Sequence, residues 1–130
     1  MSLIIEFRDR PRIALEVVFD EDVMPRNIAN AFRFALKSYL YNKDRALYEF
    51  SVHSGIPSNT VSRQLGCGKS VNKLINYKTA EAACNYFKVD FLFLYTIAEQ
   101  FVKNPEYNAI SFSDNGAVIF LKGFKFLYSD

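Results

Sequence analysis

The 130-residue chain is 50% hydrophobic and 23% charged, so it has the length and apolar content of one globular domain and is not a disordered chain. Its 16 Lys and Arg residues against 14 Asp and Glu residues leave a net charge of +2, too small to identify a polyanionic partner from bulk charge. Any nucleic-acid-binding surface must therefore be local.

The sequence lacks the features of a secreted or membrane protein. Glu6 and Asp9 interrupt the N-terminal stretch that a signal peptide would keep apolar. The longest apolar run, residues 91–98, is far shorter than the roughly 20 residues that cross a bilayer. We therefore expect a soluble, cytoplasmic protein with no membrane partner.

The N-terminal segment, residues 3–19, is predicted to form β-strands. Residues 3–7 and 13–19 are rich in Ile, Val and Phe, which favour strands. Between them, residues 9–12 have the turn-like sequence Asp-Arg-Pro-Arg. We expect either a hairpin or two short separate strands.

Residues 25–103 are predicted to form a helical core. Its first helix begins at Pro25, because the fixed φ of proline suits a first helical turn. Apolar residues then repeat at spacings of three and four and define the buried face: Ile28, Ala31, Phe32, Ala35, Leu36 and Tyr39. Residues 42–44 interrupt this pattern, and the side chain of Asp44 is expected to cap the next helix by accepting from unpaired backbone amides.

Residues 45–66, RALYEFSVHSGIPSNTVSRQLG, carry the most informative pattern. The first part predicts a short helix that Gly55 ends, because glycine readily takes the left-handed conformation of a tight turn. A second short helix follows, with Val61 and Leu65 four residues apart on its buried side. Two short helices joined by such a turn form the helix-turn-helix layout, in which the second helix presents its N-terminal residues to bases in the major groove.

Four groups of residues here follow a known family pattern. They are Phe50-Ser51, Gly55-Ile56, Thr60-Val61-Ser62-Arg63, and the next helix over residues 78–89, with Ala80, Ala83, Cys84 and Phe87 on its buried face. With these groups, residues 28–101 resemble the Cro/repressor type, or XRE-like, helix-turn-helix family. The resemblance implies a sequence-specific DNA-binding regulator of transcription, such as a repressor, of phage or mobile-element type.

Three features depart from the pattern of that family. Ser54 stands at a position that is usually apolar, and Gln64 stands where an aliphatic residue is usually buried. The segment 66–77 is a few residues longer than the usual loop. The sequence therefore leaves open whether Gln64 is buried or faces DNA.

Local charge favours a nucleic-acid surface around the predicted helix-turn-helix. Residues 45–88 carry six basic and two acidic side chains, a net charge of +4, whereas the rest of the chain carries ten basic and twelve acidic ones, a net charge of −2. Positive charge gathered in this way suits contacts with DNA phosphates. Within it, Arg63 could read guanine and Asn59 could pair with adenine. The candidate DNA-binding residues are Ser58, Asn59, Thr60, Ser62, Arg63, Lys69 and Lys73.

A further helix is predicted over residues 90–103, before Asn104-Pro105 ends it. The residues expected to face inward are Phe91, Leu94, Tyr95, Ala98 and either Phe101 or Val102. Leu92, Phe93 and Ile97 extend the apolar surface nearly all round. Such a helix needs cover on more than one side.

Residues 108–128 are predicted to form a β-hairpin. Two apolar segments flank Asp114-Asn115-Gly116, a typical hairpin turn, and residues 124–128 continue the pattern. Both strand faces are apolar, so one face is expected to pack on the helices and the other on the N-terminal strands or a second subunit. We favour a homodimer formed through this C-terminal β-segment. The alternative is that residues 3–19 cover it within one chain.

The sequence contains few residue patterns that are typical of catalytic sites. His53 is the only histidine and has no readable nucleophile or metal partner, so we expect a surface or packing residue. Residues 66–70, Gly-Cys-Gly-Lys-Ser, resemble the end of a phosphate-binding loop, but Arg63 stands where that motif requires glycine. Cys67 and Cys84 are the only cysteines and form no zinc or disulfide pattern; Cys84 is expected in the core. We expect neither an enzyme nor a bound metal or cofactor.

The sequence as a whole predicts a single α+β domain over residues 1–130. It would contain a helix-turn-helix core of about five helices, with antiparallel β-strands from both chain ends. The function that this architecture favours is regulation of transcription through double-stranded DNA. The alternative is a protein-interaction module, antirepressor or antitoxin-like, that keeps the helical fold without binding DNA.

Overall fold

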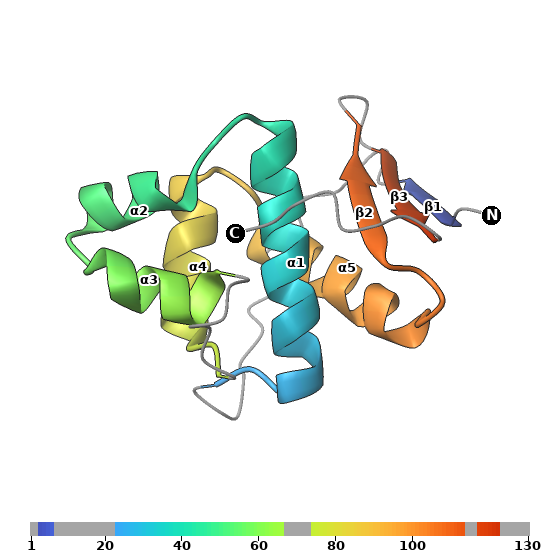
Figure 1. Ribbon diagram of the computed structural model, residues 1–130, viewed down its shortest axis with the longest axis horizontal. Helices are drawn as coiled ribbons and strands as arrows, with labels where there is room; N and C mark the ends of the chain where they lie inside the picture. The colour runs from blue at the N-terminus through green and yellow to red at the C-terminus, as the bar shows by residue number, and fades with distance from the viewer. Residues whose placement is uncertain (1–2, 7–22, 67–73, 114–116, 123–130) are drawn as a thin grey trace.

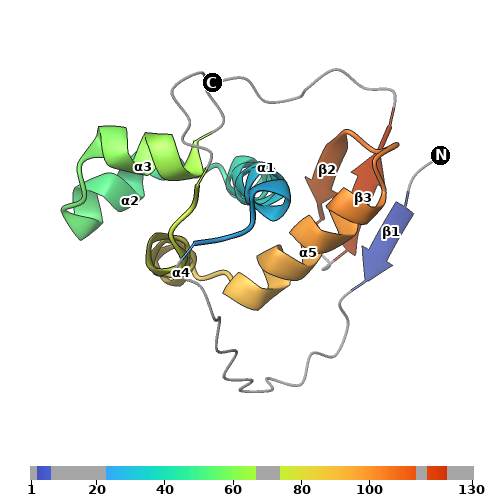
Figure 2. The ribbon, with the colours of Figure 1, turned by 90° about the horizontal axis from the view of Figure 1, so that it is seen from below.

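The computed structural model describes residues 3–6, 23–66, 74–113 and 117–122. Five helices and three strands make up these parts of the chain, which confirms the predicted α+β class. They are, in chain order, β1 (Leu3–Glu6), α1 (Arg26–Asn42), α2 (Leu47–Ser54), α3 (Ser58–Leu65), α4 (Tyr77–Tyr86), α5 (Phe91–Lys103), β2 (Ala109–Phe112) and β3 (Ala117–Leu121). Helix α1 stands between the α2–α3 pair on one side and the sheet on the other (Figures 1 and 2).

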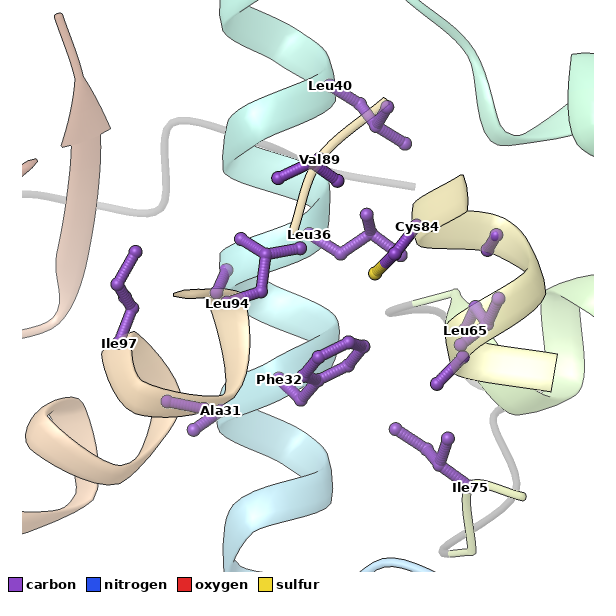
Figure 3. Close-up of a cluster of buried hydrophobic side chains, with 14 of the residues drawn as sticks. Ala31, Phe32, Leu36, Leu40, Leu65, Ile75, Cys84, Val89, Leu94 and Ile97 are labelled. Atoms are coloured by element: carbon purple, nitrogen blue, oxygen red, sulfur yellow. The ribbon is translucent and has the colours of Figure 1, made fainter. Parts of the chain in front are cut away.

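The hydrophobic core is built around one face of α1. Phe32 and Leu36 are almost completely buried there, with Leu65 from α3, Cys84 from α4 and Leu94 from α5 packed around them. Figure 3 shows these side chains converging from four helices. The apolar spacing in the sequence predicted this face correctly, although Ile28 and Tyr39 lie at its margin and are half-buried.

Helices α4 and α5 begin at side-chain caps. Asn76 precedes α4 and its Oδ1 accepts from the backbone N–H of Lys78 at 2.9 Å. Asp90 precedes α5 and accepts from Leu92 at 3.2 Å. Each cap satisfies a donor that the first helical turn leaves unpaired. Ala80, Ala83, Cys84 and Phe87 are buried as predicted, but α4 ends at Tyr86 rather than at residue 89, because Lys88 takes a positive φ of 57°.

Helix α5 is covered on two sides, as its broad apolar surface requires. It packs on α1, and Phe93 and Phe101 reach the sheet, where their rings lie 6.3 Å from Phe112 and 5.3 Å from Phe120. The sequence pattern placed Ile97 at the edge of the apolar surface, but its side chain is 0% exposed. Ile97 therefore belongs to the core, because this helix is enclosed from both sides.

The three strands form one antiparallel sheet in the order β1-β3-β2. In the register, Phe120 lies opposite Leu3 on one side and Ile110 on the other. The N-terminal strand thus pairs with the edge of β3, whereas we expected it to pack across one face. Residues 13–19, the turn at 114–116 and residues 124–128 lie outside the described residues.

The expectation that Asp44 caps the second helix is wrong. Ala46 occupies the N-cap of α2, and no side chain caps that helix. Asp44 instead has a positive φ of 53°, and the next backbone N–H, that of Arg45, donates to the carbonyl of Leu40 at 2.9 Å. Asp44 therefore helps to end α1, because short polar residues tolerate the left-handed conformation that closes a helix.

The position of Cys84 makes a prediction about thiol chemistry. Burial raises the pKa of its thiol from the ordinary 9.0 to about 12, so the folded protein keeps it neutral. In a Cys67→Ser variant we expect Ellman's reagent at about pH 8 to leave Cys84 unmodified until denaturant is added. The free energy of unfolding should also fall as the pH rises from 9.0 toward 12, since the unfolded chain ionises first. Rapid labelling of the native variant would contradict this placement.

Candidate nucleic-acid interface

The turn between α2 and α3 has the conformation that the sequence predicted. Gly55 ends α2 with a φ of 79°, and its N–H donates to the carbonyl of Ser51 at 3.1 Å. The Ser51 hydroxyl, itself buried, donates to the carbonyl of Ile56 at 2.7 Å. The hydroxyl of Ser54 accepts from the N–H of Ile56 at 3.2 Å. Hydrogen bonds of two hydroxyl groups thus stabilise the turn, together with the packing of Ile56 on the core.

Helix α3 is amphipathic, with its polar side facing solvent. Val61 and Leu65 are 2% and 1% exposed and fix the helix to the core. The predicted DNA-binding residues of the helix lie away from this contact: Ser58, Asn59, Ser62 and Arg63 are exposed, and Thr60 is half-buried. Lys69 and Lys73 lie outside the described residues. The structure therefore brings together the α3 members of the predicted site.

The side chain of Gln64 does not join this exposed polar surface. It is half-buried, and its Oε1 accepts from the backbone N–H of Asn76 at 3.2 Å. The contact ties the last turn of α3 to the residue that caps α4. Gln64 thus occupies an inward position with a hydrogen bond where an aliphatic residue would use packing alone.

Arg33, on α1, is a buried residue whose contacts were not predicted from the sequence. Its side chain is 1% exposed, and its Nε donates to the carbonyl of Gln64 at 2.6 Å. Another nitrogen of the guanidinium donates to the carbonyl of Leu74 at 3.2 Å, and a third donates to Oδ1 of Asn30 at 2.8 Å. Arg33 therefore fixes the C-terminal end of α3 and the segment that leads into α4.

The sequence contained a signal for this role. Ala29, Phe32, Leu36 and Leu40 are buried residues of α1 at helical spacing, and Arg33 falls on the same stripe. An arginine at such a position must find hydrogen-bond acceptors, because a buried guanidinium without them is very unfavourable. The carbonyls at the end of a helix are suitable acceptors, since no later turn of the helix uses them.

The basic residues near α3 differ in their contacts within the chain. Arg45 forms an ion pair with Glu49 at 2.6 Å and lies over the rings of Tyr86 and Phe87. That pairing offsets its charge. Arg63 is exposed, and its Nε lies 3.4 Å from the carbonyl of Asn59, folded back along its own helix. Lys78 is exposed at the start of α4, which packs beside α3 (Figure 1).

His53 is exposed, and its ring lies 4.9 Å from that of Tyr86, as a surface packing residue would. The part of the chain that the structure describes holds no group of three side chains that could bind a metal. Within the same residues no helix is long and apolar enough to span a bilayer. The phosphate-loop-like segment, apart from Gly66, lies outside them.

Replacement of Gly55 tests the geometry of the turn. A Cβ at this position would meet no atom within 4 Å, so the cost of a side chain comes from backbone strain. We expect Gly55→Val to lower the free energy of unfolding by about 1–3 kcal/mol, measured by urea denaturation. Gly55→Asn should cost less, because asparagine tolerates the left-handed region. Equal stability of all three proteins would show that the turn does not require a positive φ.

Replacement of Arg33 tests the anchor of α3. Arg33→Met keeps much of the side-chain volume but removes the donors to Gln64 and Leu74. We expect the free energy of unfolding to fall by about 2–4 kcal/mol, because the partly buried carbonyls of Gln64 and Leu74 lose their charged donor. Arg63→Met, at an exposed position, is the matched control and should change stability by about 0.5 kcal/mol or less. Similar losses for both variants would contradict the anchoring role.

Comparisons of the chain with protein-family models, with curated proteins and with solved structures found no match. The interpretation of this surface rests on the geometry of the chain itself.

Proposed function

We propose that this protein is a sequence-specific DNA-binding regulator that places α3 in the major groove. The observation that carries the proposal is the exposed polar side of α3, presented by a helix-turn-helix whose opposite side is fixed to the core by Val61 and Leu65. An α-helix fits the width of the major groove of B-form DNA. No acidic residue lies on α3, so nothing on the helix itself repels phosphates.

The side chains on this surface suit direct contacts with bases. Asn59 lies in the first turn of α3, where its amide could donate to and accept from adenine. Arg63 follows one turn later and could leave the carbonyl of Asn59 to contact guanine through two nitrogens. Ser58 and Ser62 supply short hydroxyl groups beside them. Lys78 would contribute to phosphate binding from the neighbouring helix.

A homodimer is part of this proposal, because one short recognition helix contacts few base pairs. Little of the C-terminal β-segment is left for contact with a second subunit. Phe120 is 0% exposed, and β3 is already paired on both edges within the chain. A dimer through this segment would therefore use Ile119 and Leu121, which are half-buried, or the outer strands. Light scattering on the wild type and on Ile119→Ser, chosen to spare the buried face, would test this.

The alternative function, a protein-interaction module, has one specific observation in its favour. Tyr48 and Val52 lie one turn apart on α2 and are 66% and 65% exposed. Large apolar side chains that share an exposed helix face are typical of protein contacts. This surface lies on α2 and not on α3, so a protein that bound there would use residues other than those proposed to contact DNA bases.

A DNA-binding titration separates the two functions. Labelled genomic fragments from the source organism would be mixed with the protein at low and at moderate salt, and binding measured by gel shift and fluorescence anisotropy. A DNA regulator should give a saturable shift on a subset of fragments, with affinity falling as salt increases. An interaction module should give no sequence-dependent shift, and that result would overturn the proposal.

Arg63 provides the sharpest mutational test. We expect Arg63→Ala to weaken binding to a selected fragment by about 1–3 kcal/mol and to relax the preference at one base pair, since it removes a bidentate contact. Lys103→Ala, an exposed cation at the end of α5 on another side of the molecule, is the matched control and should bind as the wild type does (Figure 1). Equal losses on selected and random DNA would show that Arg63 contacts only phosphate.

A further inference from the structure

An open cavity of about 350 Å³ lies between the first half of α1 and the end of α5. Helix α1 contributes Asn27, Asn30 and Phe34 to its wall. The other side comes from Phe101, at the end of α5, and from Pro105 and Tyr107 in the segment that follows. Its volume lies at the lower end of the range for small-molecule sites, and it is a broad depression in the surface, so a compact ligand bound there would keep one side in contact with solvent.

The residues around this cavity favour a neutral planar ligand. The rings of Phe34 and Phe101 stack on each other, with centroids 5.5 Å apart and planes 24° apart, and together form an apolar wall of the cavity. Asn27 and Asn30 add amide groups that both donate and accept. None of the lining residues is a Lys, Arg, Asp or Glu, so a phosphate or carboxylate group would find no charged partner. Stacking together with amide recognition suits a heterocycle such as a purine base.

One wall of the cavity is linked to the candidate recognition helix. Oδ1 of Asn30 accepts from the guanidinium of Arg33 at 2.8 Å, and Nε of the same guanidinium donates to the carbonyl of Gln64 at 2.6 Å. A ligand that hydrogen-bonds to the Asn30 amide acts on a side chain that orients Arg33. Arg33 in turn holds the last turn of α3.

We propose that this cavity binds a neutral planar heterocycle of purine size. A bound ligand would change the hydrogen bond that Arg33 donates to the carbonyl of Gln64 at the end of α3. The binding step stands on the cavity alone. The regulatory step rests on the DNA-binding function proposed above.

The binding step is tested by NMR titration of the full chain with adenine and, separately, adenosine. We expect backbone resonances of Asn30, Phe34 and Tyr107 to shift, and the affinity to fall at least tenfold in Asn27→Leu, which removes one lining amide at similar side-chain shape and at an exposed position. Asn85→Leu, an equally exposed change on α4, is the matched control and should bind as the wild type does. If adenine binds and adenosine does not, the cavity excludes the sugar. If both bind, the ring is the group that the cavity recognises. Absence of shifts with both probes at millimolar concentration, or equal affinity in all three proteins, would overturn the assignment.

The coupling between the cavity and α3 can be tested without DNA, by hydrogen exchange. Adenine at saturation should change the hydrogen-exchange rate of the Leu65 and Gly66 amides, which adjoin the Gln64 carbonyl, whereas in Asn27→Leu it should not. With DNA, the apparent affinity for a fragment selected by gel shift should change at least threefold on addition of adenine. Binding of adenine without either change would overturn the coupling and leave the cavity as a binding site. A wild type that binds adenine but no DNA fragment would instead overturn the proposed function, and the exchange measurement would still decide the coupling.

Discussion

The buried guanidinium of Arg33 is the constraint on which the helix-turn-helix depends. It extends from the middle of α1 to the carbonyl of Gln64, at the end of α3, and to the carbonyl of Leu74, just before α4. These segments are 31 and 41 residues away in the sequence. A side chain that is planar and carries five donors in fixed directions can satisfy several carbonyls at once. The ends of two helices therefore take their positions relative to α1 from one residue.

Apolar packing supplies the rest of the framework, and aromatic rings dominate it. Phe32 lies against Phe91 at 5.4 Å, Phe101 against Phe120 at 5.3 Å and Tyr39 against Phe112 at 5.6 Å. These contacts join α1 and α5 to each other and to the sheet. The sheet lies on the side of α1 away from α2 and α3 (Figure 2). The sheet thus stabilises the helix that carries Arg33 and leaves the polar side of α3 uncovered.

The polar side of α3 and the cavity beside α1 are both open to solvent, at opposite ends of the hydrogen bonds of Arg33. Asn59 and Arg63 project from a helix whose other side has little freedom to move, which is the arrangement that base recognition requires. The cavity lies at the opposite end of the Arg33 contacts, where Asn30 is exposed and accessible to a small molecule. Arg45, by contrast, forms an ion pair with Glu49, so its charge is already engaged within the chain.

The sequence by itself determined the elements whose signals are local. Repeats of three and four residues predicted α1, and Gly55 predicted the turn before α3, because each depends on the conformation of a few neighbouring residues. The tertiary structure decided what Arg33, Gln64 and Ile97 contact, and it assigned Asp44 to the end of α1 rather than the start of α2. It also placed β1 beside β3, in a pairing that joins residues more than a hundred positions apart. Such contacts depend on which segments meet after the chain folds, and hydrophobic spacing along one helix or strand carries no information about its distant neighbour.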